Sequence, residues 1–225
     1  MRILLVSATQ EEIPGWFKGT ATQSRKSSFS GLTIDVLVTG PGINHTAFWL
    51  GRRLAGSAYD LVINAGIAGS FNNSLPSGTV TQVTTDRFAD FGYTSPEGFT
   101  DASAAGLLSP AGDWLSADGW ITSTQHEGLT SLQQLSEVRG ITVQTVTGDA
   151  RTIEQMRERY HPDIETMEGA AFLYACHQSG MPALCIRAIS NWVEPRNKAN
   201  WNIPLAVQEL NATLNAILNE LNQSV

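Results

Sequence analysis

The chain has 225 residues, of which 42% are hydrophobic and 16% are charged, and its formal net charge at pH 7 is −7. This length and apolar fraction predict a single globular domain over residues 1–225 with one large core. The acidic balance provides no basic surface for nucleic acid or for an anionic membrane, so we expect a small-molecule partner.

No stretch approaches 18 unbroken apolar residues, and the apolar run at residues 2–6 is too short for the core of a signal peptide. The two cysteines, Cys176 and Cys185, lie in apolar surroundings and indicate neither a disulfide framework nor a zinc site. The four histidines have no metal-ligand spacing. We therefore expect a cytoplasmic protein with no metal and no organic cofactor.

Strand-like and helix-like runs alternate along the chain. The runs typical of strands lie at 2–7, 32–38, 60–66, 79–85, 141–147 and 183–190. The runs typical of helices lie at 11–18, 43–55, 127–138, 151–160, 168–179 and 202–221. This alternation predicts a three-layer α/β/α sandwich around a mostly parallel, mixed central sheet.

Two segments depart from the alternation. Ser30-Gly31 stands between two short runs within residues 29–38, which predicts a hairpin there. Residues 92–119 are rich in Gly, Ser, Pro, Asp and Ala, lack a sustained period and are long for a plain connection. We expect this second segment to form either a lid or a contact between subunits.

Glycines follow two of the strand-like runs, in Gly40-Pro41-Gly42 and in residues 66–69. Such glycines let the backbone approach a ligand at the carboxyl edge of a sheet, although tight strand-to-helix turns explain them equally well. The dinucleotide pattern G-x-G-x-x-G fails because His45 stands at its third glycine, and no P-loop Gly-Lys-Ser/Thr occurs. NAD and ATP are therefore not expected as ligands.

Carboxylates stand where strand-like runs end. Glu11 and Glu12 follow the first strand directly, and Glu168 begins a helix beside the small residues 169–171. Acids in a first helical turn often only complement the helix dipole or bind its amides. In this architecture, however, strand ends converge on the crevice where ligands bind, and a ribose diol offers two donors to one carboxylate. Together with Asn191 at the end of the last strand, these residues point to a nucleoside site.

These stretches, in their order and spacing, resemble the purine nucleoside phosphorylase and nucleosidase superfamily, most closely its methylthioadenosine/adenosylhomocysteine nucleosidase branch. The matching stretches are Glu11-Glu12, Gly40-x-Gly42, residues 64–69, Gly148-Asp149, residues 167–170 and residues 187–191. The resemblance implies hydrolysis of an N-glycosidic bond through an oxocarbenium-like transition state. It also implies a homodimer in which a partner loop helps to close the site; residues 87–93 are the candidate for this loop, and local packing within the chain explains them as well.

The resemblance assigns roles to individual residues. Glu12 matches the residue that activates the attacking water. Glu168 would bind the ribose hydroxyls, and Met167 would pack under the sugar. Gly66 and Ile67 would line the substrate site.

Two positions depart from the adenine-specific branch. Asn191 replaces an aspartate, and an asparagine can donate to a 6-oxo oxygen while it accepts from a protonated N7, so a 6-oxopurine is expected. Because an amide is no general acid, Asn191 would stabilise the leaving base by hydrogen bonding alone. Arg151 replaces an aromatic residue that stacks on the base, and Ile67 replaces a small polar residue.

Residues 189–196, with Trp201 and Pro204 beyond them, are similar to the futalosine hydrolase family. The substrate in that family is an inosine-like nucleoside with a carboxyphenyl ketone arm, which is cleaved to hypoxanthine and dehypoxanthinyl futalosine on a route to menaquinone. Independently, Trp192 and Trp201 flank Arg196, and an aromatic surface beside a cation can hold an aromatic carboxylate, although packing of both rings against the last helix explains them equally well. The candidate cations are Arg196, Arg151 and Arg87, and a surface ion pair explains each of them equally well.

Three other functions stay open on the sequence. The chain could be a nucleosidase of the methylthioadenosine/adenosylhomocysteine type. It could be a 6-oxopurine nucleoside phosphorylase, although the carboxylate of Glu12 would repel a phosphate dianion and so favours water as the nucleophile. It could also be a nucleoside-binding protein, which would have little use for a water-activating base.

Overall fold

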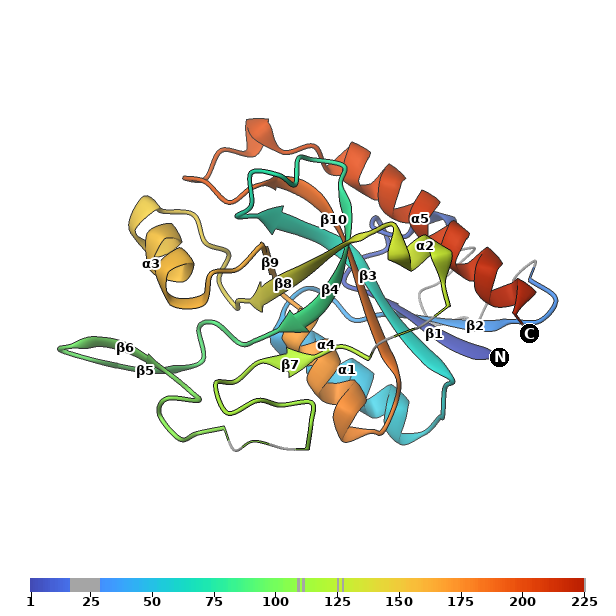
Figure 1. The fold of residues 1–225 in the computed structure, drawn as a ribbon, viewed down its shortest axis with the longest axis horizontal. Coiled ribbons are helices and arrows are strands. Elements are labelled where there is room, and N and C mark those ends of the chain that lie inside the picture. The colour runs from blue at the N-terminus through green and yellow to red at the C-terminus, as the bar shows by residue number, and fades with distance from the viewer. Residues whose placement is uncertain (17–28, 109, 111, 125, 127, 225) are drawn as a thin grey trace.

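The computed structural model describes residues 1–16, 29–108, 110, 112–124, 126 and 128–224 (Figure 1). In this part of the chain, eight strands form one mixed sheet: β1 (Arg2–Ser7), β2 (Thr33–Val38), β3 (Leu61–Ser70), β4 (Val80–Asp86), β7 (Ile121–Thr122), β8 (Ser136–Thr142), β9 (Ile164–Thr166) and β10 (Ala183–Trp192). Strands β5 (Gly92–Ser95) and β6 (Gly98–Asp101) pair as a separate ribbon.

Helices cover both faces of the sheet (Figure 1). They are α1 (Ile43–Ala55), α2 (Thr130–Gln133), α3 (Ala150–Tyr160), α4 (Gly169–Gln178) and α5 (Ile203–Gln223), with short 3-10 turns at Pro14–Trp16 and Lys198–Asn200. Side chains alternate between the faces: Leu4 and Val6 of β1 pack in the cluster formed with α1 and α4, and Ile3 and Leu5 pack in the cluster formed with α5. The predicted three-layer sandwich is confirmed.

The sheet curls because β10 pairs with two strands that stand apart in the order β10-β4-β8-β9-β3-β1-β2. Strand β10 is parallel to β3 and antiparallel to β4. On its other edge, β3 pairs with β1 over residues 61–64 and with β9 at residues 69–70. Residues 65–68 of β3 therefore have no strand partner on that edge, which is where the candidate site lies.

Several predicted elements match the structure. The helices at 43–55, 151–160, 168–179 and 202–221 correspond to α1, α3, α4 and α5, with ends shifted by at most two residues. The strands at 2–7, 32–38 and 79–85 correspond to β1, β2 and β4. The strands predicted at 60–66 and 183–190 correspond to β3 and β10, and both extend further than expected. Strand β3 continues through Gly66 and Gly69, which do not form the expected turn.

The predictions of a helix at 127–138 and of a strand at 141–147 are wrong. Within 127–138 the helical part described is Thr130–Gln133, and residues 136–142 form β8. The three-residue spacing of Leu129, Leu132 and Leu135 imitates a helix face. Gly140 lies within β8, and a Cβ there would lie 2.8 Å from Oδ2 of Asp86 on β4, so the close packing of the two strands requires glycine at this position.

Two predictions near the N-terminus also differ from the structure. The helix at 11–18 is replaced, in its described part, by turns and the 3-10 turn at Pro14–Trp16, since a proline interrupts α-helical bonding; residues 17 and 18 lie outside the described residues. The hairpin at 29–38 is wrong in the described residues: β2 runs parallel to β1, and Gly31 is tied by its N–H to Oδ1 of Asn222 and by its carbonyl to the amino group of Met1.

Candidate functional site

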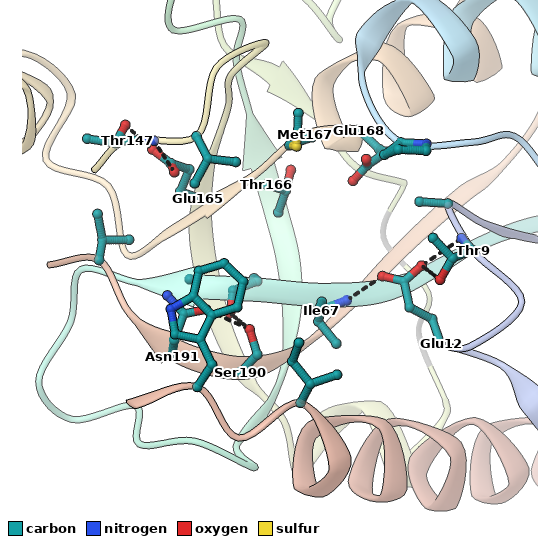
Figure 2. A pocket seen from close by; sticks show the side chains of 18 of the residues that line it. Thr9, Glu12, Ile67, Thr147, Glu165, Thr166, Met167, Glu168, Ser190 and Asn191 are labelled. Atoms are coloured by element: carbon teal, nitrogen blue, oxygen red, sulfur yellow. Dashed lines mark hydrogen bonds between the residues drawn. The ribbon is translucent and has the colours of Figure 1, made fainter. Parts of the chain in front are cut away.

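A cavity of about 430 Å³ opens at the carboxyl ends of β1, β3 and β10. This is the edge at which ligands bind in open α/β sheets. Its lining joins segments that are far apart in sequence: Ala8, Thr9, Glu11, Glu12, Pro41, residues 67–69, residues 146–147, residues 165–168, residues 190–194, Arg196, Trp201, Ile203 and Val207. Figure 2 shows polar side chains at both ends of this cavity.

Glu12 is buried and held by hydrogen bonds at both carboxylate oxygens. Its Oε2 accepts from Ser7 Oγ at 2.9 Å and from Thr9 N at 2.9 Å, and its Oε1 accepts from Ile67 N at 3.1 Å. A Cβ at Gly66 would lie 3.0 Å from the same Oε1, so the carboxylate depends on glycine at that position. The arrangement fixes a buried carboxylate at the cavity wall, within reach of a ligand in the cavity.

Glu168 is the N-cap residue of α4, but its side chain does not cap the helix. Two threonine hydroxyls from neighbouring strands accept the first helical N–H groups instead: Thr166 Oγ1 accepts from Gly169 at 3.2 Å, and Thr142 Oγ1 from the next residue at 2.8 Å. The Glu168 carboxylate accepts from Gly42 N at 2.9 Å, and Gly42 has a φ of 96°. The carboxylate is therefore left facing the cavity.

Arg187 lies behind these carboxylates on β10 and is 1% exposed. Its guanidinium donates to the carbonyl oxygens of Asn64 at 3.2 Å and Ile186 at 3.0 Å, and also to Asn64 Oδ1. Burial raises the pKa of Glu168, and the Arg187 charge opposes this shift. We assigned Arg187 no role from the sequence, although an arginine inside an apolar strand is a signal of such a buried cation.

Asn191 sits at a β-bulge, where the register of β10 against β3 shifts between Ile189 and Asn191. The bulge brings Asn191 opposite Gly69 and re-aims its side chain. Its Oδ1 accepts from Ser190 Oγ at 2.7 Å and its Nδ2 donates to the Trp192 carbonyl at 2.8 Å. One amide hydrogen and one oxygen lone pair are left for a ligand.

Glu165 is the third buried carboxylate of the cavity described here and lies at the same end as Asn191 (Figure 2). It accepts from Thr147 N at 3.0 Å and from Thr147 Oγ1. Burial raises the pKa of Glu165, and the negative charge of nearby Asp90 raises it further. The hydrogen bonds from Thr147 act in the opposite direction and lower this pKa. We assigned Glu165 no role from the sequence.

The rim of the cavity is aromatic and carries a cation. Trp192, Trp201 and Arg196 all line it, and the Arg196 guanidinium carbon lies 5.6 Å from the centroid of the Trp201 ring. The Arg196 backbone N–H donates to the Gly148 carbonyl at 3.0 Å, which ties this loop to the segment before α3. Such a rim can hold a flat anionic group.

Most of the residues proposed from the sequence meet in this cavity. Its lining includes Glu12, Met167, Glu168, Asn191, Ile67, Trp192 and Arg196. Gly66 stands directly beside the Glu12 carboxylate. Arg151 is exposed at the start of α3 and is not among the lining residues.

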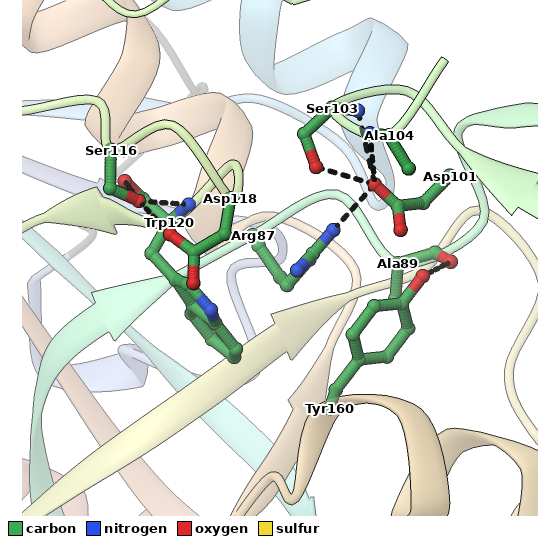
Figure 3. Close-up of polar contacts among 9 residues, drawn as sticks. All are labelled: Arg87, Ala89, Asp101, Ser103, Ala104, Ser116, Asp118, Trp120 and Tyr160. Carbon is green, nitrogen blue, oxygen red and sulfur yellow. Dashed lines mark hydrogen bonds and ion pairs between the residues drawn. The ribbon is translucent and has the colours of Figure 1, made fainter.

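Arg87 lies outside the cavity lining as well. It is buried, forms an ion pair of 3.0 Å with Asp101, and its guanidinium carbon lies 4.2 Å from the ring centroid of Tyr160 (Figure 3). Arg87 thus joins β6 to α3. None of the described residues of 92–119 lines the cavity, and the expectation that this segment forms a lid or a contact between subunits stays a prediction.

Two further features of the described residues bear on the class of protein. No three or more His, Cys, Asp or Glu side chains gather there as a metal site would need. None of the helices in that part of the chain combines the length and apolar character required to cross a membrane.

Comparison with known proteins gives consistent matches over the whole chain. A family model of the phosphorylase superfamily matches residues 2–221. A futalosine hydrolase of Streptomyces coelicolor is 29% identical over 230 residues, covering 93% of this chain and 92% of that protein. A futalosine hydrolase of Acidothermus cellulolyticus is 31% identical over 182 residues, covering 79% and 72%. The solved structure of a methylthioadenosine/adenosylhomocysteine nucleosidase from Colwellia psychrerythraea aligns with a TM-score of 0.76 at 19% identity, covering 98% and 96%.

The chain belongs to the phosphorylase superfamily. Within it, the chain is a nucleosidase, an enzyme that hydrolyses N-glycosidic bonds. The superfamily and the fold predicted from the sequence motifs are confirmed.

Proposed function

We propose that this nucleosidase hydrolyses futalosine to hypoxanthine and dehypoxanthinyl futalosine in menaquinone biosynthesis. One observation carries the proposal: a single cavity has carboxylates suited to a ribose at one end and the amide of Asn191 at the other, with an Arg196–Trp201 pair at its rim. The similarity to two futalosine hydrolases over most of the chain supports it.

Glu12 is proposed as the general base. Because its carboxylate is held by four backbone or hydroxyl donors, it can take a proton from a water on the anomeric carbon without reorienting. Its negative charge also favours the oxocarbenium-like sugar that develops as the glycosidic bond breaks. A phosphate dianion in the same place would be repelled, so water is the expected nucleophile.

Glu168 and Met167 are proposed to hold the sugar. The Glu168 carboxylate uses one backbone donor, Gly42 N, and has acceptor capacity left for two ribose hydroxyls. Met167 is half-buried in the lining beside it and would pack under the ring, and Ile67, whose backbone N–H bonds to Glu12, lines the same cavity. These contacts would orient the anomeric carbon towards Glu12.

Asn191 is proposed to recognise a 6-oxopurine. Its free amide hydrogen would donate to O6, and its free oxygen lone pair would accept from N7 as that atom gains a proton. The amide stabilises the departing base but is no general acid, so the proton itself comes from solvent or from another group. An adenine base, with an amino group at position 6, would lose this pairing.

Arg196 is proposed to meet the carboxylate of the futalosine arm, with Trp192 and Trp201 against its aromatic ring. Arg196 is exposed at the rim, and the Trp201 ring lies beneath its guanidinium. A planar guanidinium matches a carboxylate with two parallel N–H groups. Arg151, which lies outside the lining, serves as the matched comparison.

A nucleosidase of the methylthioadenosine/adenosylhomocysteine type is the second candidate. Ile203 and Val207 give the cavity an apolar wall that would also accept a methylthio group. The two candidates differ at the base, since that substrate carries a 6-amino group and Asn191 favours a 6-oxo group.

The experiment is an incubation of the purified protein in phosphate-free buffer with futalosine, inosine and methylthioadenosine, with free base followed by chromatography. Hypoxanthine released from futalosine supports the proposal. Adenine released from methylthioadenosine with futalosine left intact supports the second candidate. Release that begins only when phosphate is added identifies a phosphorylase, and binding without any release identifies a nucleoside-binding protein.

We also propose that the chain forms a homodimer. Large apolar side chains are exposed on α1 (Phe48 at 60%), on α4 (Tyr174 at 38%) and at or just before β5 (Tyr93 at 52% and Phe91 at 44%). Exposed apolar groups of this kind favour association. Size-exclusion chromatography with light scattering would give a mass near twice 24.3 kDa for the dimer, and a mass of one chain at micromolar concentration would contradict it.

A further inference from the structure

Glu165 and Asn191 occupy matching positions on either side of Gly69. Strand β9 pairs with β3 so that Glu165 lies opposite Gly69, and β10 pairs with the other edge of β3 so that Asn191 also lies opposite Gly69. Partners in register point to the same face of a sheet, and two strand spacings separate their Cα atoms by roughly 10 Å. All three residues line the cavity.

Gly69 keeps the space between the two side chains open. A Cβ at this position would lie 3.3 Å from Asn191 Nδ2 and 3.0 Å from Val193 Cγ2, so a larger residue would crowd the amide. The result is a slot with Gly69 as its floor, the Glu165 carboxylate on one side and the Asn191 amide on the other. Figure 2 shows both side chains at the end of the cavity opposite Glu12.

The Glu165 carboxylate has acceptor capacity that the protein does not use. The structure gives it hydrogen bonds from Thr147 N at 3.0 Å and from Thr147 Oγ1, one to each oxygen. A carboxylate offers about four acceptor positions, so about two are left, and no ion pair to Glu165 occurs among the described residues. A carboxylate that is 5% exposed and faces a cavity is costly unless a ligand donor completes its bonding.

A 6-oxopurine carries that donor next to the group that Asn191 would bind. Its N1–H is adjacent to O6, whereas adenine has a bare N1 with a lone pair at the same place. We propose that Glu165 is a base-recognition residue that accepts the N1–H of a 6-oxopurine while Asn191 contacts O6 and N7. The inference rests on the proposed function and adds a second residue to its base selectivity.

A structural role is the competing explanation, because Glu165 also anchors the loop at Thr147. A purely structural residue would affect all bases alike when replaced. A base-recognition residue affects ligands with an N1–H more than those without it. The two roles are therefore separated by the ratio of affinities and not by the loss of activity.

The experiment measures dissociation constants by calorimetry for hypoxanthine, 1-methylhypoxanthine and adenine, with the wild type, Glu165→Gln and Glu158→Gln. Glutamine keeps the shape of Glu165 and can still form hydrogen bonds with Thr147, but it removes the negative charge. Glu158→Gln is the control, because Glu158 is an exposed acid on α3 and its replacement removes the same charge away from the cavity. The same proteins are assayed for release of hypoxanthine from futalosine in phosphate-free buffer.

The expected result is a wild type that prefers hypoxanthine over both other bases. In Glu165→Gln, the preference for hypoxanthine over 1-methylhypoxanthine falls by about tenfold or more, as for the loss of a charged acceptor. Glu158→Gln keeps the wild-type ratio. A wild type that binds hypoxanthine and 1-methylhypoxanthine equally overturns the inference even where Glu165→Gln fails to fold.

The failure of this inference differs from the failure of the proposed function. Hydrolysis of futalosine with an unchanged affinity ratio in Glu165→Gln overturns the role of Glu165 and leaves the substrate in place. Intact futalosine, together with a hypoxanthine preference that Glu165→Gln removes, overturns the substrate and supports the role of Glu165.

Discussion

The Glu12 carboxylate and the Ile67 backbone N–H lie 3.1 Å apart across an open edge of β3. Strand β1 leaves this edge after Asn64 and β9 joins it at Gly69, so the N–H between them has no strand partner there. A backbone donor of this kind must find another acceptor, and here the acceptor is a side chain. The gap between two strands thus fixes the orientation of the proposed base.

Glu12→Gln should abolish most of the turnover while leaving substrate binding nearly intact. Glutamine has the same shape and can keep an acceptor for Ile67 N, but it cannot take a proton. We expect kcat for futalosine to fall by about 10²- to 10⁴-fold with KM changed by less than about threefold. Steady-state kinetics of purified protein checks this, and retention of more than a tenth of kcat would remove Glu12 from the role of base.

Gly66→Ala should displace the Glu12 carboxylate while leaving the glutamate itself unchanged. The added Cβ would lie 3.0 Å from Glu12 Oε1, so the side chain must shift, and small misplacements of a reacting group lower rates strongly. We expect kcat to fall on the order of 10- to 100-fold. Gly51→Ala is the matched control, because nothing lies within 4 Å of a Cβ there. Equal activities of the two variants would contradict the proposed contact.

Arg196→Gln and Arg151→Gln should differ in their effect on the arm of futalosine. Arg196 lines the cavity and is exposed, so loss of its contact with a carboxylate should raise KM about fivefold to tenfold, as for a partly screened ion pair. Arg151 lies outside the lining, and its replacement should leave KM unchanged. Release of hypoxanthine from inosine, which has no arm, should respond to neither change. Equal values of KM for futalosine in the two variants would dismiss Arg196.

Asp86→Asn should change how stability depends on pH. Burial raises the pKa of Asp86 from 3.8 to about 7, and its Oδ2 has no hydrogen-bond partner in the structure. Between these two pKa values the folded state keeps a proton on Asp86 that the unfolded state has lost. The stability that depends on the protonated carboxyl is therefore complete below about pH 4 and is lost as the pH rises through about 7. Relative to wild type, the variant should gain up to about 1.4 kcal/mol per pH unit over this range.

Urea unfolding of both proteins at pH 4.5, 5.5, 6.5 and 7.5 measures this difference. The isosteric asparagine keeps an acceptor for Thr142 Oγ1 and Arg87 N, which bond to Asp86 Oδ1 at 2.9 and 2.7 Å. A difference in the free energy of unfolding that stays constant with pH would show that Asp86 is ionised in the folded state throughout.

The sequence predicted the parts of the site that follow strand ends directly. Glu12 follows β1 and Glu168 precedes α4, so local order along the chain was enough to place both near the carboxyl edge. The helices with a clear apolar period were also predicted, because α1 and α5 each bury one face against the sheet.

The rest depends on contacts between distant segments that no local pattern encodes. Strand β9 has three residues, too few for a period, yet it brings Glu165 beside Gly69. The bulge that re-aims Asn191 arises from pairing between β10 and β3. From the sequence, Arg87 was a candidate for binding the substrate arm or for a surface ion pair, and its buried pairing with Asp101 on β6 of the β5–β6 ribbon was not predicted.

The most direct test of the account is the ratio of kcat/KM for futalosine to that for methylthioadenosine, measured in phosphate-free buffer for wild type and Asn191→Asp. The account predicts a wild type that strongly prefers futalosine, and a fall of this ratio by about tenfold or more in Asn191→Asp, because an ionised carboxylate repels O6 and accepts from a 6-amino group. A wild type that cleaves methylthioadenosine more efficiently than futalosine, or a ratio that the substitution leaves unchanged, would contradict it.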